Sequence, residues 1–221
     1  MTEFNIAGPS TVNGLKDALI ANGGLDYFDE ITAESVSDGR KTTFTKGSLS
    51  MYITEVSSGN ASVDGTTIGD MKCLLKGYAT DSAIVLFGAV NASASGLRYN
   101  WPIVIFKTVN GDPALFHCLQ ISGTVYTNTP GFTSGTGAMG RFRCITLTEN
   151  TKIANTSDFA QYNNSDNYLT TASLPSVPDS SKDVYFCTTR PYASVLNPFM
   201  LSINGVSYAS FAYNSILVKT T

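Results

Sequence analysis

The stretch IVIFKTVNGDPALFHCLQI, residues 103–121, contains two apolar runs separated by the turn signal Asn110-Gly111-Asp112. Both runs have the length of a strand and are rich in β-branched and aromatic residues. An Asn-Gly pair suits a two-residue turn, because both residues tolerate a positive φ. We therefore predict a β-hairpin here, and a second one in FMLSINGVSYASF, residues 199–211, around Asn204-Gly205.

The same pattern of short β-type runs and turn residues extends over most of the chain. Short β-type runs separated by Gly, Asn and Asp are found at 42–49, 51–56, 71–78, 83–90, 98–107, 114–121, 141–147, 184–188, 199–203, 206–211 and 215–219. Many short strands with frequent turns are typical of a sandwich or barrel. We expect a mainly β protein whose residues 37–221 form an antiparallel β-sandwich or jelly-roll-like body.

The N-terminal segment, residues 1–36, contains the one clear helical pattern. Ser10 or Asn13 can cap the helix, and Asn22-Gly23-Gly24 can end it in a left-handed conformation. Its apolar face consists of residues at helical spacing: Val12, Leu15 and Leu19. A helix of about three turns is marginal alone. We therefore interpret the segment as an attachment arm or assembly helix that packs on this subunit or on a neighbouring one.

Composition narrows the set of partners. The 221-residue chain has a formal net charge of −3 and no cluster of Lys and Arg, which is unfavourable for nucleic-acid binding. No apolar run approaches the roughly 18 residues that a membrane-spanning helix needs. The opening MTEFNIAGPS lacks a basic start followed by an apolar block, so no secretion signal is expected. We expect synthesis in a cytoplasm, with no nucleic-acid partner and no membrane insertion.

The cysteines and the single histidine do not predict a metal site. Four cysteines lie far apart in apolar runs, at Cys73, Cys118, Cys144 and Cys187. In a reducing cytosol such residues are small buried hydrophobes. A metal site would need close ligand spacing or several histidines, and His117 is the only one in the sequence. No metal and no cofactor are expected.

Three patterns suggest an enzyme, but each has a simpler interpretation. Residues 135–140 match G-x-G-x-x-G, yet the β-type run RFRCITL follows where a nucleotide-binding helix should begin. His117 and Cys118 are neighbours on an expected strand, so their side chains point to opposite faces. Asp26, Asp29 and Glu30 supply carboxylates of the kind that glycoside hydrolysis requires, but they also fit the polar face of a connecting strand. We expect no enzyme, although a glycan hydrolase or esterase remains the third class of function.

The most extended polar segments, 127–140 and 149–183, are expected to be long loops. The C-terminal part of the chain concentrates aromatic residues among Ser, Asn and Gly, a composition that suits contact surfaces as well as sandwich cores. Tyr192 and Tyr213 lie in its expected loops and are the candidate surface contacts.

The chain resembles the virion structural proteins of tailed bacteriophages. The resemblance covers the opening MTEFNIAGPSTVNGLKDALIANGG without a secretion signal, the weakly charged β body, and the aromatic end running to SILVKTT. It implies a fibre, baseplate, collar or other tail part, or alternatively a capsid decoration or head-fibre protein, assembled in the host cytoplasm and located in the virion. It also implies a homo-oligomer, of which a trimer is one form, with other virion proteins and a host surface glycan as further partners. A free carbohydrate-binding module is the alternative of a different class.

Overall fold

A computed structural model of the chain describes residues 1–58, 61–67, 73–89, 99–107, 111–121, 139–146, 168–169, 183–186, 198–203, 205–211 and 216–220. Within this part, one α-helix, one short 3₁₀ helix and three antiparallel sheets are formed. The expectation of a mainly β protein with a single short N-terminal α-helix is therefore confirmed.

A seven-stranded sheet has the order β1-β7-β8-β9-β10-β11-β12. Its strands are β1 (Thr2–Asn5), β7 (Cys73–Ala79), β8 (Ala83–Ala89), β9 (Tyr99–Lys107), β10 (Pro113–Ile121), β11 (Met139–Thr146) and β12 (Tyr168–Leu169). A five-stranded sheet consists, in order, of β2 (Glu30–Val36), β3 (Gly39–Lys46), β4 (Leu49–Val56), β5 (Ser62–Val63) and β6 (Thr66–Thr67). A four-stranded sheet has the order β13 (Val184–Phe186), β16 (Ile216–Lys219), β15 (Val206–Phe211) and β14 (Phe199–Ile203).

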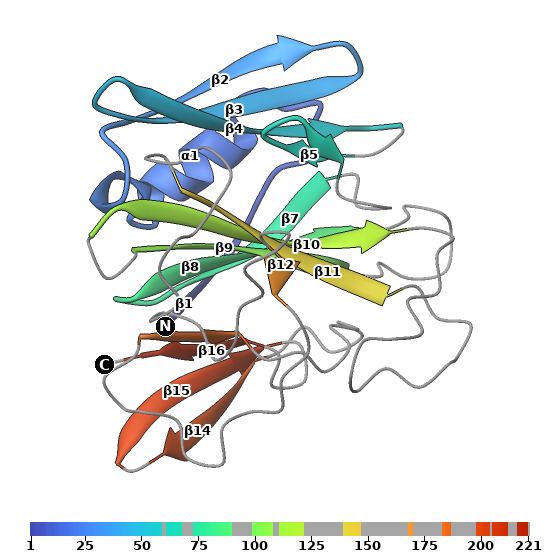
Figure 1. The fold of residues 1–221 in the computed structure, drawn as a ribbon. Coiled ribbons are helices and arrows are strands. Elements are labelled where there is room, and N and C mark those ends of the chain that lie inside the picture. Colours follow the sequence, from blue (N-terminus) through green and yellow to red (C-terminus); the bar gives the residue numbers. More distant parts are fainter. Residues whose placement is uncertain are drawn as a thin grey trace.

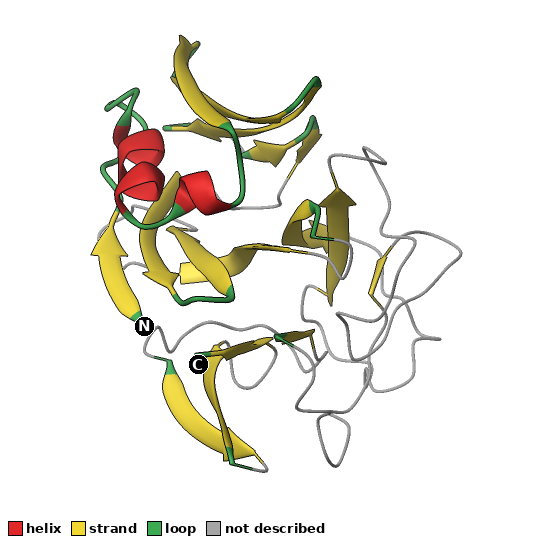
Figure 2. Cartoon of the chain, turned by 90° about the vertical axis from the view of Figure 1, so that its left-hand side faces the viewer, coloured by secondary structure: helices red, strands yellow, loops and turns green. Residues whose placement is uncertain are grey.

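The three sheets are stacked as layers, with the seven-stranded sheet in the middle (Figure 1). The five-stranded sheet covers one face of it, and α1 (Gly14–Ala21) lies between these two layers. The four-stranded sheet covers the opposite face, and the view turned by 90° shows the same order (Figure 2). The body is thus sandwich-like, with an additional layer on the central sheet.

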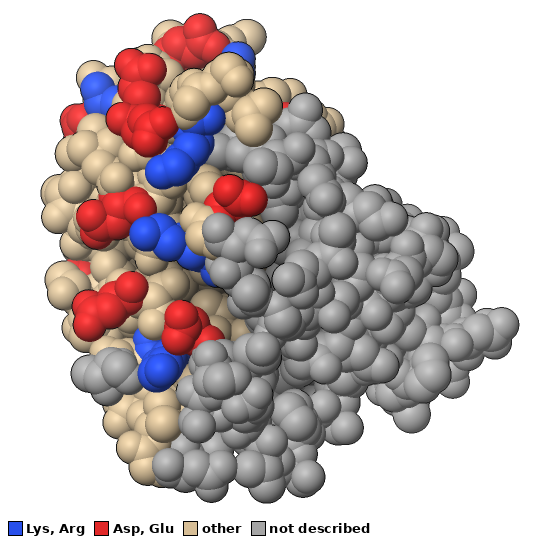
Figure 3. All heavy atoms as spheres, turned by 60° about the vertical axis from the view of Figure 1, so that its left-hand side comes forward, with Lys and Arg blue, Asp and Glu red and all other residues tan. Residues whose placement is uncertain are grey.

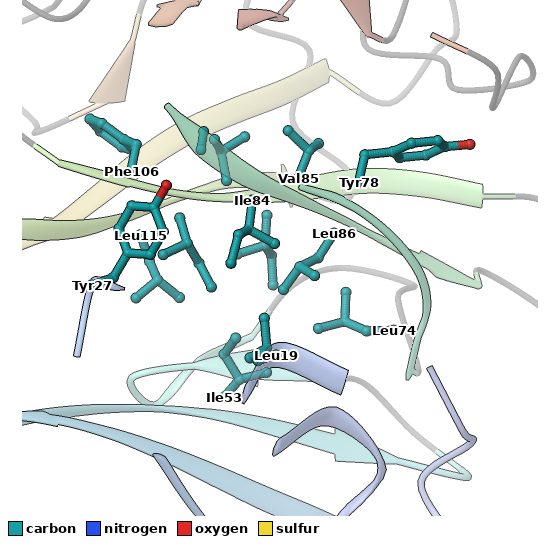
Figure 4. Packing of buried hydrophobic residues seen from close by; sticks show 14 of the residues in the cluster. Leu19, Tyr27, Ile53, Leu74, Tyr78, Ile84, Val85, Leu86, Phe106 and Leu115 are labelled. Carbon is teal, nitrogen blue, oxygen red and sulfur yellow. The ribbon is translucent and has the colours of Figure 1, made fainter. Parts of the chain in front are cut away.

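β8 shows how the sequence produces a central layer. Residues 83–87, AIVLF, are apolar without interruption, and each is at most 1% exposed. Successive side chains of a strand point to opposite faces, so a continuous apolar run needs cover on both sides. Ile84 and Leu86 point toward α1 and β4, and Val85 points to the other face (Figure 4).

Both predicted hairpins form. β14 and β15 pair up to Ile203–Val206, which leaves a two-residue turn in which Gly205 has φ +80°. β9 and β10 pair up to Lys107–Pro113, so residues 108–112 connect them and Gly111 has φ +84°. This second connection is longer than the predicted two-residue turn. Pro113, which begins β10, disfavours the α region for the residue before it.

Helix α1 is shorter than predicted and ends where predicted. It covers Gly14–Ala21, about two turns rather than three, and its N-cap residue Asn13 makes no side-chain capping hydrogen bond. Gly23 has φ +87° and ends the helical path. A 3₁₀ turn, η1 (Gly24–Asp26), then leads toward β2.

The N-terminal segment is part of the sheets. β1 pairs with β7, and β2 pairs with β3 from Glu30–Thr45 to Val36–Gly39. The expected boundary after residue 36 therefore falls in the turn of a hairpin. The assembly role expected for this segment stays a prediction.

A buried ion pair ties the start of the chain to three strands. Arg40 on β3 donates to both carboxylate oxygens of Glu55 on β4, at 2.7 and 2.8 Å. The same guanidinium donates to the carbonyl oxygens of Ala7, Gly8 and Thr11 at 2.7 to 3.1 Å. Glu55 also accepts a hydrogen bond from the N–H of Leu74 on β7 at 2.6 Å. Two charged side chains thus hold the N-terminal segment against the five- and seven-stranded sheets.

Candidate functional site

The residues expected to form an assembly helix are used inside the subunit. Leu15 and Leu19 have no exposed surface and belong to the hydrophobic core, and Val12 is half-buried before the helix begins. Figure 4 shows Leu19 beside Ile53 of β4, facing the central sheet. The other candidate contacts, Tyr192 and Tyr213, lie outside the described residues.

The structure has a strand at the place where the nucleotide-binding interpretation requires a helix. Met139 and Gly140, the last residues of the 135–140 pattern, already belong to β11, where Gly140 pairs with Gln120. A strand therefore follows the pattern, whereas pyrophosphate binding needs a helix N-terminus there. Residues 135–138 lie outside the described part.

The structure also contains the His117–Cys118 pair and small parts of the two predicted long loops. His117 and Cys118 are neighbours on β10 and pair with Arg143 and Phe142 of β11. Of the predicted long loops, 127–140 and 149–183, the described parts are the start of β11, the short strand β12 and Asp183.

The acidic group at residues 26–30 is divided between two places. Asp29 accepts a hydrogen bond from the N–H of Gly47 at 2.7 Å and pairs with Lys46 at 3.5 Å, so it holds the β3–β4 turn. The hydrogen bond from Gly47 lowers the pKa of the Asp29 carboxyl below its usual value. Asp26, in η1, instead lines a surface pocket. Asp29 therefore stabilises a turn, whereas Asp26 faces a pocket.

This pocket has a volume of about 480 Å³ and lies where α1 ends, beside the β7–β8 turn and the start of β13. We call it the Tyr27 pocket. Its side chains with hydrogen-bonding groups include Asn22, Asp26, Tyr27, Asp81, Lys107 and Asp183. Ala21 and Ala79 add small apolar surface.

Tyr27 is the buried member of this set. Its side chain belongs to the hydrophobic core and is 5% exposed. Its hydroxyl points away from Leu19 and Ile53 (Figure 4) and makes no side-chain hydrogen bond among the described residues. Burial raises the pKa of the Tyr27 hydroxyl above its usual value, and the charges of Asp26, Asp81 and Asp183 raise it further. The phenol therefore keeps its proton and is available as a donor.

Two lysines balance part of the negative charge at the pocket. The ammonium of Lys107 lies 5.6 Å from the centre of the Tyr27 ring, within the range of a cation–π contact. Lys219, on β16, pairs with Asp183 at 3.7 Å. The wall therefore offers carboxylate acceptors together with ammonium and phenol donors.

The β7–β8 turn holds its part of the wall by local hydrogen bonds. Thr80 Oγ1 accepts hydrogen bonds from the N–H groups of Ser82 and Ala83, at 3.2 and 3.0 Å. These bonds hold Asp81 at the tip of the turn, where its side chain is exposed. The backbone position of Asp81 is thus defined by the turn.

Sequence reasoning did not identify Tyr27. The usable signal was an aromatic residue between acidic ones in LDYFDE, directly after a predicted helix stop. Asp81, Lys107 and Asp183 come from distant parts of the chain and have no local signal in common.

A second exposed feature lies on the outermost described strand of the four-stranded sheet. Phe199 and Met200 on β14 are 46% and 54% exposed, although neighbours on a strand point to opposite faces. β14 pairs with β15 on one side and has no partner strand on the other in the described part.

Charged side chains of both signs are mixed over the described face of the molecule (Figure 3). Among the described residues, no group of three or more His, Cys, Asp and Glu is placed to hold a metal ion. In the same part of the chain, no helix has the length and apolar character to cross a membrane.

Comparison of the chain with protein-family models, with curated proteins and with solved structures found no match.

Proposed function

We propose that this chain is a non-enzymatic structural protein of a tailed-bacteriophage virion, part of a tail, fibre, baseplate or collar appendage, and that it works as a homo-oligomer. The observation that carries the assembly part of the proposal is β14, an edge strand with exposed apolar side chains. The virion part rests on the resemblance of the chain to phage structural proteins.

Edge strands of folded proteins are normally protected against pairing by charged residues, proline or bulges. β14 has the sequence FMLSI, which contains no charged residue and no proline. Its pairing with β15 is regular, without a bulge. Its side away from β15 has no partner strand in the described part of the chain and presents backbone donors and acceptors together with apolar side chains. These are the requirements for adding another strand.

The occupant we propose is β14 of a second copy of the chain. A strand without charge meets its own copy without repulsion between like charges. Antiparallel pairing about Leu201, the central residue of the five, would generate a two-fold contact and place Phe199 of each copy near Ile203 of the other. Contacts through other surfaces would extend this pair into a larger assembly.

The assembly test is the mass of the full chain in solution, measured by light scattering at micromolar concentration. We expect an oligomer for the wild-type chain and a smaller species for Phe199→Ser/Met200→Ser. The matched control is Ile20→Ser/Leu25→Ser, because these apolar side chains are exposed to a similar extent, 41% and 50%, away from β14. A monomeric wild-type chain, or an equal loss of mass in both double variants, would contradict the proposed contact.

The proposed location in a virion is tested on purified phage particles. Phage particles purified from an infected culture should contain the chain in a fixed copy number by quantitative mass spectrometry. Gold-labelled antibodies should then mark the tail or its appendages in electron micrographs. Labelling of the head would select the alternative of a capsid decoration or head-fibre protein, and absence from the particle would refute the virion assignment.

A further inference from the structure

We propose that the Tyr27 pocket is a binding site for an uncharged saccharide, with the Tyr27 hydroxyl as a hydrogen-bond donor in its wall. This inference does not depend on the proposed assembly through β14. The pocket and that strand belong to different surfaces, and no residue is shared between them.

The first argument is the state of Tyr27. A tyrosine whose ring is buried and whose hydroxyl stays accessible presents a hydrogen-bond donor at a defined position. Tyr27 is 5% exposed and lines the pocket, and its hydroxyl oxygen, which has no side-chain partner among the described residues, is not one of the fully buried atoms. A ligand in the pocket would accept a hydrogen bond from this hydroxyl in place of solvent.

The second argument is the composition of the wall. Carboxylates of Asp26, Asp81 and Asp183 are acceptors, whereas the Tyr27 phenol and the Lys107 ammonium are donors. A hydroxyl group donates and accepts at the same time, so a ligand with several hydroxyls can satisfy both kinds of wall group. An anionic ligand would instead meet three carboxylates.

The third argument is that the wall residues come from distant segments and enclose a pocket of suitable volume. Asp26 comes from η1, Asp81 from the β7–β8 turn, and Asp183 from the residue before β13, so three distant segments converge. Asp183 is held there by Lys219, and Asp81 by the Thr80 turn. The volume of about 480 Å³ falls in the range of ~300–1,000 Å³ that is usual for small-molecule sites. Ala21 and Ala79 leave small apolar surface for the C–H face of a sugar ring.

The test is an NMR titration of the ¹⁵N-labelled full chain with four separate probes: glucose, galactose, mannose and N-acetylglucosamine. We expect at least one of them to shift the amide signals of Gly23, Asp26 and Asp81 in a saturable way. In Tyr27→Phe the ring remains and the hydroxyl is lost. The dissociation constant should rise about tenfold, which corresponds to ~1.4 kcal/mol.

The chain offers a matched control in Tyr52 on β4, outside the pocket. The ammonium of Lys41 lies 5.0 Å from the Tyr52 ring centre, so this residue has the same lysine–tyrosine arrangement. Tyr52→Phe should bind the sugar as the wild type does. An unchanged affinity in Tyr27→Phe would overturn the proposal, as would the absence of pocket shifts with all four sugars. Shifts with the polyamine spermidine but with none of the sugars would show that the ligand is a cation and would also overturn it.

Discussion

Arg40 and Glu55 face each other across β3 and β4 as a two-point ion pair whose side chains have no exposed surface. Burial raises the pKa of the Glu55 carboxyl, while the Arg40 guanidinium and the N–H of Leu74 act in the opposite direction. A buried charge is tolerated when its partners are complete. Here they are complete, because Arg40 also donates to three carbonyl groups of the N-terminal segment.

Replacing Arg40 should therefore be strongly destabilising. We expect Arg40→Met to lower the free energy of unfolding by about 3–5 kcal/mol, because Glu55 and three carbonyl oxygens lose their donor. Arg40→Lys should not restore stability, since one ammonium cannot make the same set of bonds. The control is Lys41→Met on the same strand, which breaks the exposed pair with Glu34. Urea unfolding measures both, and equal effects at residues 40 and 41 would contradict this role.

Thr42 carries the one buried side-chain oxygen without a hydrogen-bond partner in the described part of the chain. Thr42→Val keeps the shape of the side chain and removes this hydroxyl. We expect stability to increase by about 1 kcal/mol, the cost of leaving a buried hydroxyl unsatisfied. Thr43→Val, on the half-buried side of the same strand, should change it little. A loss of stability in Thr42→Val would mean that the hydroxyl has a partner.

The ring of Phe4 on β1 lies directly over Gly77 on β7, and the two residues are paired across the strands. A methyl group at position 77 would overlap the ring, so Gly77→Ala should displace Phe4 and weaken the attachment of β1. The expected loss of stability is about 1–3 kcal/mol. Faster hydrogen exchange of the amides of β1 should accompany it. Gly8→Ala is the control, because nothing lies within 4 Å of an added methyl group there.

Phe211 joins the four-stranded sheet to the central one. Its ring centre lies 5.5 Å from that of Tyr78 and 5.9 Å from that of Phe87. We expect Phe211→Ala to lower the free energy of unfolding by about 3–5 kcal/mol, because it leaves a cavity between two layers. Leu25→Ala removes a half-exposed apolar side chain away from β14 and should cost much less. Similar losses from the two changes would argue against the layered arrangement.

The pKa of Asp29 leads to a prediction about acid stability. Because the folded pKa lies below the unfolded value of about 3.9, the ionised carboxylate stabilises the folded state above that value. This contribution should be lost as the pH falls through the folded pKa. Asp29→Asn should therefore lower the urea midpoint near neutral pH and show a smaller decrease in acid than the wild type. Parallel pH profiles of the two proteins would contradict the prediction.

Several elements could be predicted because their signals are local. The β-type runs, the Asn204-Gly205 turn and the helix stop at Gly23 depend on residues that are close in sequence, and the described residues contain strands at each of these runs. The predicted run 42–49 is divided, because β3 ends at Lys46 and β4 begins at Leu49 after a turn with Gly47 at φ +59°. The β9–β10 connection is longer than the predicted two-residue turn, because the pairing ends at Lys107 and Pro113 and not at the residues next to Asn110-Gly111. The packing partner of the short helix could not be predicted from local signals, because Leu15 and Leu19 are apolar at helical spacing whether they face a neighbouring subunit or their own core.

The sequence by itself determined that this chain is mainly β, where its hairpins turn, and that 83–87 must be covered on both faces. These properties follow from side-chain periodicity and from the conformations that Gly, Asn and Pro allow. Only the tertiary structure decided which layers provide the cover, that Arg40 meets Glu55, and that Tyr27 shares a pocket with Asp81 and Asp183. Alternation along a strand says that a face is buried but not what lies against it. Contacts between distant segments depend on how the whole chain packs.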